Sequence, residues 1–119
     1  MKNYVILLDA TMKNGNIVIV CDNTVVDFLP FAGKDERSGR MDKDILIQIE
    51  NLLAKNNIER KNISGVFLTR AGSLTQNRIL GAVCLGLQNS LNINAKTLSQ
   101  EELLSISGIS TIKTLSQGI

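Results

Sequence analysis

Residues 4–29 read YVILLDATMKNGNIVIVCDNTVVDFL and contain three apolar runs separated by turn-forming residues. The first run, Tyr4–Leu8, is continuous, which is typical of a central strand covered on both faces. The second run, Ile17–Cys21, is rich in β-branched residues and follows a glycine-containing turn. The pair Asp22-Asn23 then leads into the third run, Thr24–Leu29. This pattern predicts three consecutive antiparallel strands.

A change of periodicity after the charged, glycine-containing loop at 31–40 predicts the first helix. Apolar residues recur at helical spacing from Ile45 to Leu53. Acidic residues lie in the first turn and Lys55 lies near the end, an arrangement that suits the helix dipole. We therefore expect a helix from Met41 to about Lys55.

The second half of the chain alternates strands with helices. Val66–Leu68 is a short apolar strand, and a second helix is expected from Gly72-Ser73 to about Leu91. Ile93–Ala95 predicts an edge strand, and Ser99 with its glutamate three residues later forms a capping box for a third helix. The order β-β-β-α-β-α-β-α predicts an α/β fold, with a mixed five-stranded sheet of three antiparallel strands followed by βαβ crossovers. We expect a single lobe over residues 1–104 and a C-terminal tail, 105–119, that is at most partly ordered.

Composition excludes several classes of function. The chain has 119 residues, no histidine and a formal net charge of +2, so it lacks the commonest general base and any strong field for nucleic acid or a membrane surface. Aromatic residues make up 3%, too few for a base-stacking platform. The apolar start is shorter than a signal sequence, and Cys21 and Cys84 have no metal-ligand spacing. We expect a cytoplasmic protein without metal or cofactor, and without direct nucleic-acid or membrane partners.

Two features could carry chemistry, and each also has a purely structural explanation. Asp9 ends the first strand, where a carboxylate could hold Mg²⁺ or simply cap the turn. Gly72, Ser73 and Thr75 lie at a strand-to-helix turn, where backbone amides could receive an anion or merely begin a helix. No second carboxylate ends a strand, because Asp27 is expected in mid-strand on the solvent face. The turn also lacks the lysine of a phosphate-binding loop.

Both long helices carry a second face that points away from the expected core when residues are projected at 100° each. These faces combine small and apolar residues, which suits the close approach of another helix. A glycine inside a helix costs about 1 kcal/mol relative to alanine, so Gly81 and Gly86 need a packing reason. Gly86 alternatively only clears the sheet or a neighbouring helix. The candidate interface residues are Asp44, Ile47, Asn51, Ala54, Arg78, Gly81, Ala82, Leu85 and Asn89.

Asp9-Ala10-Thr11 at the end of the first strand and the stretch Arg70–Leu80 at the start of the second helix match the motifs of a known family. Over about Tyr4 to Leu104, the chain resembles the N-terminal half of the TsaB (YeaZ) family, bacterial proteins needed to make threonylcarbamoyladenosine in tRNA. The family's first strand ends in Asp-Thr-Ser, which Asp9-Ala10-Thr11 matches in part. Its motif Gly-Pro-Gly-Ser-Phe-Thr-Gly-Leu-Arg-Ile-Gly corresponds to Arg70–Leu80, with alanine in place of proline and without the later glycines. The second lobe of the family has no counterpart. The motif positions retained are Gly72, Ser73, Thr75 and Arg78.

The resemblance implies one lobe of the ribonuclease-H-like, actin-like ATPase fold and a non-catalytic role. TsaB-like proteins pair with the enzyme TsaD through their first two helices and self-associate through the same surface. By this resemblance the chain is a scaffold in tRNA modification, with a TsaD-like protein or a second copy on Ile47, Ala82 and Leu85. Two alternatives stay open: a small nucleotide-binding or phosphoryl-transfer enzyme using Asp9 and the Gly72-Ser73 turn, and a degenerate relic that only forms a homodimer.

Overall fold

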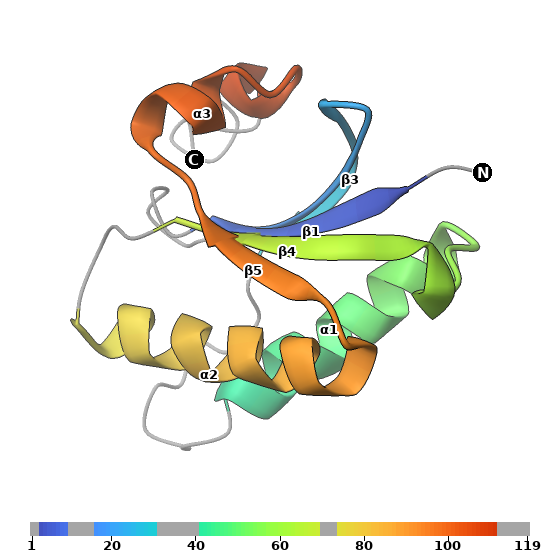
Figure 1. Cartoon of the computed structure of the whole chain (residues 1–119), viewed down its shortest axis with the longest axis vertical. Helices are drawn as coiled ribbons and strands as arrows, with labels where there is room; N and C mark the ends of the chain where they lie inside the picture. Colours follow the sequence, from blue (N-terminus) through green and yellow to red (C-terminus); the bar gives the residue numbers. More distant parts are fainter. Residues whose placement is uncertain (1–2, 10–15, 31–40, 70–73, 112–119) are drawn as a thin grey trace.

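A computed structural model describes residues 3–9, 16–30, 41–69 and 74–111 of the chain. Five strands form one sheet in the order β3-β2-β1-β4-β5 (Figure 1). The elements are β1 (Tyr4–Asp9), β2 (Asn16–Cys21), β3 (Thr24–Pro30), α1 (Met41–Lys55), the 3-10 turn η2 (Arg60–Asn62), β4 (Ile63–Leu68), α2 (Leu74–Leu91), β5 (Asn94–Thr97) and α3 (Gln100–Leu104).

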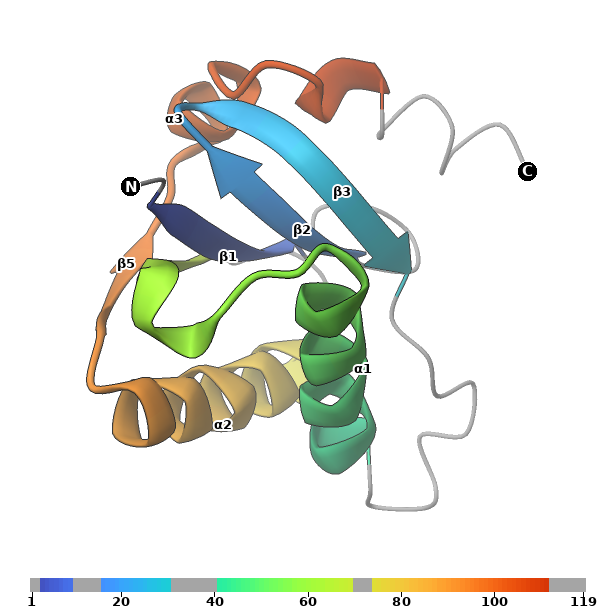
Figure 2. The ribbon, with the colours of Figure 1, turned by 90° about the vertical axis from the view of Figure 1, so that its right-hand side faces the viewer.

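The sheet is mixed, as the sequence predicts. β1 pairs antiparallel with β2, and β2 pairs antiparallel with β3. β4 joins the other side of β1 in parallel, and β5 extends the sheet in parallel with β4. α1 and α2 cover one face of the sheet, while α3 lies over the other (Figure 2). This arrangement confirms the predicted fold class.

Each sheet face has its own apolar core because successive side chains of a strand point to opposite faces. Ile6 and Leu8 of β1 pack with buried side chains of α1 and α2. Leu7 packs on the opposite face with Leu103 of α3 and with Ile109. The two cores therefore share β1 as their common wall.

Local signals define the ends of several elements as predicted. Asp22 and Asn23 both have positive φ, which a type I′ hairpin turn requires, and they join β2 to β3. Both hydrogen bonds of the predicted capping box form at the start of α3. The Ser99 hydroxyl accepts from the amide of Glu102, and the Glu102 carboxylate accepts from the amide of Ser99.

Two strands differ from the prediction by more than one residue at an end, and β1, β2 and β3 are each one residue longer than predicted. β4 begins at Ile63, three residues before the expected start at Val66. Ile63 and Gly65 both pair with β1, and Ser64 lies at the register shift between them, so sheet pairing overrides the weak strand propensity of Gly65. β5 covers Asn94–Thr97, one residue later at its start and two at its end than Ile93–Ala95.

The expectation that Asp27 lies on the solvent face is wrong. The register of β3 shifts opposite Ile19 and Val20, and this bulge turns Asp27 toward the C-terminal end of α1. Its carboxylate accepts hydrogen bonds from the Asn56 side chain at 2.9 Å and the Phe28 amide at 2.8 Å. The Lys55 ammonium lies 3.5 Å away, and the Asp27 side chain is only 22% exposed. Asp27 therefore fastens the edge strand β3 to α1.

The chain continues to pack beyond residue 104, where the sequence places the end of the lobe. Ile106 and Ile109 are buried on the α3 side of the sheet, and Ser107 forms an isolated bridge to Thr24. The division at residue 104 stays a prediction, and residues 112–119 of the expected tail lie outside the described residues.

The surroundings of Asp27 predict a pH-dependent contribution to stability. Burial raises the pKa of Asp27, but hydrogen bonds from Asn56 and Phe28 and the charge of Lys55 more than offset this, so the net pKa lies below its usual value. A lowered pKa in the folded state stabilises the protein above the unfolded-state pKa, and that stabilisation is lost as the pH falls through the folded-state pKa. We expect Asp27→Asn to lower the free energy of unfolding at pH 7 by about 1–2 kcal/mol, with the difference from wild type shrinking toward pH 2–3, as measured by urea denaturation.

The matched control is Asp22→Asn, which removes the same charge from an exposed turn. A stability gap for Asp27→Asn that stays constant from pH 7 to pH 2.5 would contradict the assignment.

Candidate functional site

The outward faces of α1 and α2 carry two of the most exposed large apolar side chains in the described part of the chain. Ile47 of α1 is 55% exposed, and Leu85 of α2 is 58% exposed. Both helices bury the opposite stripe, where Ile45 of α1 and Val83 of α2 are fully withdrawn from solvent. The amphipathic spacing therefore leaves apolar groups in water on the side of the layer that faces away from the sheet.

The other predicted interface residues with described side chains are also exposed: Asn51, Ala54, Arg78, Gly81, Ala82 and Asn89. They share the outer side of the helix layer with Ile47 and Leu85. The side chains of Asp44 and Thr75, and the whole of Gly72 and Ser73, lie outside the described residues. The motif turn therefore stays a prediction.

The two glycines of α2 have different surroundings. A Cβ built on Gly81 meets no atom of the described residues within 4 Å, so packing among those residues does not require glycine there. A Cβ on Gly86 would lie 3.8 Å from Cδ1 of Leu46 on α1, an ordinary van der Waals contact. Gly86 thus faces α1 without being essential for its approach, and projection at 100° per residue places Gly81 on the opposite flank of α2.

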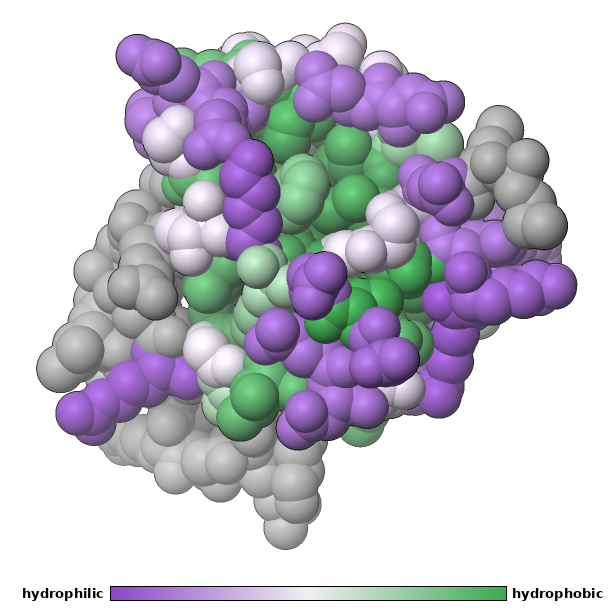
Figure 3. All heavy atoms as spheres, in the orientation of Figure 1, coloured by the Kyte–Doolittle hydropathy of each residue, from purple (hydrophilic) through white to green (hydrophobic). Residues whose placement is uncertain are grey.

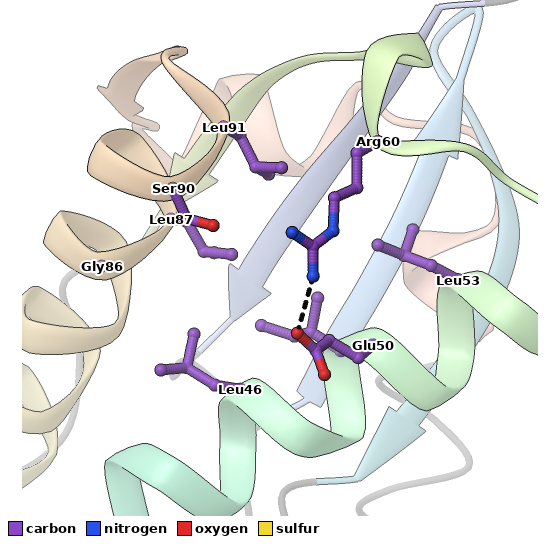
Figure 4. A pocket seen from close by; sticks show the side chains of 9 residues that line it. Leu46, Glu50, Leu53, Arg60, Gly86, Leu87, Ser90 and Leu91 are labelled. Atoms are coloured by element: carbon purple, nitrogen blue, oxygen red, sulfur yellow. Dashed lines mark hydrogen bonds and ion pairs between the residues drawn. The ribbon is translucent and has the colours of Figure 1, made fainter.

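A shallow hollow of about 130 Å³ lies between α1 and α2 (Figure 4). Leucine side chains form much of its walls, and the Arg60 side chain of η2 reaches between the helices to Glu50 of α1, with 3.0 Å between nitrogen and oxygen. Both charged side chains are more than 60% exposed, so this ion pair contributes little to stability. Arg60 was not predicted from the sequence, because helical periodicity carries no information about a turn outside the helices.

A buried polar cluster lies at the carboxyl ends of the parallel strands β1 and β4. Asp9 is 0% exposed, and Thr69 and Asn16 are almost as buried. The Thr69 hydroxyl lies 3.1 Å from Oδ1 of Asp9, and Asn16 is the β2 partner of Asp9 in the ladder. The cluster supplies a structural role for Asp9, since a buried carboxylate requires hydrogen-bond donors. Thr69 was missed although it directly follows β4, a position that is informative once strand order is known.

The described residues offer little support for metal binding, for a reactive cysteine or for a membrane-spanning helix. Among the described residues, no group of three or more histidine, cysteine or acidic side chains is arranged to hold a metal ion. Burial raises the pKa of the Cys84 thiol, which makes it a poor nucleophile. None of the helices in the described ranges is long and apolar enough to cross a membrane.

Comparison with known proteins gives a structural likeness only. No protein-family model matches the sequence, and no curated protein matches it. Among solved structures, YeaZ from Pseudomonas aeruginosa superimposes with a TM-score of 0.65 at 15% sequence identity, over 98% of this chain and 50% of that chain. A second structure, of an uncharacterized protein with similarity to peptidase YeaZ from Pseudomonas aeruginosa, gives a TM-score of 0.64 at 15% identity with the same coverage. The chain thus has the fold of one half of YeaZ and spans about half the length of these proteins.

The open surroundings of Gly81 predict that alanine is better for folding at this position. Alanine favours a helix interior by about 0.8–1.0 kcal/mol over glycine. We expect Gly81→Ala to raise the free energy of unfolding by about that amount in denaturant titrations. Gly86→Ala, which gains a contact with Leu46, should be at least neutral. Destabilisation by Gly81→Ala would mean that the outer face of α2 is crowded in the monomer.

Proposed function

We propose that the chain is a non-catalytic, TsaB-like scaffold protein of the tRNA threonylcarbamoyladenosine machinery. In this proposal, the outward faces of α1 and α2 pack against helices of a TsaD-like protein or of a second copy of the chain. The single observation that carries the proposal is the joint exposure of Ile47 and Leu85 on one side of the molecule. The superposition on half of YeaZ supports the choice of process.

The surface has the properties of a helix-packing interface. Small residues flank the two apolar side chains, so a partner helix can approach the backbone of α2 closely at Gly81 and Ala82. Polar residues such as Arg78 and Asn89 lie beside them, which resembles the polar rim that surrounds an interface core.

Energetic estimates favour a partner that brings apolar groups of its own. Full burial of a leucine or isoleucine contributes roughly 1.5–3 kcal/mol. A symmetric homodimer would cover Ile47 and Leu85 from each copy, each already almost half buried, for a gross gain on the order of 4–6 kcal/mol. Association itself costs about 4–15 kcal/mol. We therefore expect weak self-association and a tighter complex with a TsaD-like protein.

Leu85→Lys tests this surface directly. A lysine there would bury an unpaired charge in the interface, which costs about 3–5 kcal/mol. We expect the dissociation constant for a co-expressed TsaD-like protein to rise at least a hundredfold, as measured by sedimentation velocity.

The matched control is Leu104→Lys, because Leu104 is 48% exposed on α3, across the sheet from α2. It should bind like wild type. Equal binding by wild type and Leu85→Lys would reject the surface, and equal weakening by both variants would point to a nonspecific effect of charge.

The rival proposal, a nucleotide-binding enzyme, draws on the burial of Asp9 at the carboxyl ends of parallel strands, where ligands of α/β proteins often bind. Under the scaffold proposal, Mg-ATP titrated into the protein in a calorimeter produces no binding heat. Binding by wild type that disappears in Asp9→Asn, a substitution of equal size, would favour the enzyme.

A further inference from the structure

The two faces of the sheet are covered very unequally. α1 and α2 have 15 and 18 residues and cover the first face. The second face is covered by α3, with five residues, and by the segment Ser105–Thr111 that follows it. Figure 3 shows apolar residues that reach the surface between α3 and the sheet, so the described residues cover this core only in part. We call α3 together with Ser105–Thr111, residues 100–111, the strap.

A small set of hydrogen bonds ties the strap to the β2–β3 hairpin. The Ser107 amide donates to the carbonyl of Asn23, and the Ser107 carbonyl accepts from the amide of Val25, both at 2.9 Å. The Asn23 side chain donates to the carbonyl of Ser105, also at 2.9 Å. Asn23, Ser105 and Ser107 are all exposed, so water competes for these bonds.

Gly108 allows the strap to lie close to β3. Its φ of +97° lies in the region that favours glycine, and a Cβ there would approach the Val25 side chain to 3.1 Å. Close contact with β3 therefore depends on the absence of a side chain at position 108.

We propose that the strap opens and closes as one cooperative unit while the sheet and the α1–α2 layer stay folded. Its buried side chains, Leu103, Ile106 and Ile109, belong to one continuous segment. A five-residue helix does not persist without tertiary packing, so release at the hairpin also melts α3. The inference does not depend on the proposed function, because the α1–α2 surface lies across the sheet.

Opening uncovers an apolar row across the middle of the sheet. Val18 of β2 pairs with Leu7 of β1 and with Phe28 of β3, and Leu7 pairs with Phe67 of β4. All four belong to the core on the strap side. The strap is held by fewer buried side chains than the α1–α2 layer and by only a few exposed hydrogen bonds, so we expect it to open at a lower free energy than that layer.

Native-state hydrogen exchange followed by NMR tests the proposal. The amides that close the strap belong to Val25, Leu103, Ser105 and Ser107. We expect them to exchange at least tenfold faster than the most protected amides of β1, with a weaker dependence on denaturant. Gly108→Ala should accelerate their exchange at least tenfold.

Variants in the α1–α2 layer separate local from global opening. Val83→Ala creates a cavity in the core between the sheet and the α1–α2 layer. It should therefore accelerate hydrogen exchange in β1 and leave exchange of the strap amides unchanged. Gly81→Ala is the second variant, in case Val83→Ala fails to fold: it should slow exchange in β1 several-fold without slowing the strap. If the strap amides change together with those of β1 in either variant, the strap opens only by global unfolding and the proposal is wrong.

Discussion

β1 lies between β2 and β4, and all its side chains from Ile6 to Asp9 are buried, so the sheet needs an apolar cover on each face. Ile6 and Leu8 require the α1–α2 layer, while Leu7 requires the strap. The proposed interface, with Ile47 and Leu85, is the outer side of the α1–α2 layer. Its position follows from the same amphipathic spacing that directs the inner side toward β1.

Sequence periodicity was sufficient for the elements that depend on local signals. The three N-terminal strands, both long helices and the Ser99–Glu102 capping box could be predicted because each has a contiguous pattern of side chains. The start of β4 and the orientation of Asp27 could not. Gly65 is in a strand because β1 and β5 lie on either side of it. Asp27 faces α1 because the extra residue at the bulge in β3 reverses the sheet face to which the following side chains point. Both depend on strand pairing, which one sequence does not encode locally.

The candidate surface shows the same division between local and tertiary information. The exposure of Ile47 and Leu85 follows from helical projection alone, and the structure has both in solvent. Arg60 in the hollow and Thr69 beside Asp9 were missed, because each reaches its neighbour through tertiary packing. Gly81 is the residue for which the structure adds most to the explanation based on sequence. No described residue lies close enough to position 81 to require glycine, and this favours a packing reason in a partner.

The two edge strands of the sheet, β3 and β5, affect how copies of this protein associate in concentrated solution. β5 offers only four residues, with Lys96 among them, and the bulge at the other border kinks β3. Short, charged or kinked borders are poor templates for strand addition. Edge-to-edge growth into fibrils is therefore disfavoured even though the protein carries exposed apolar side chains.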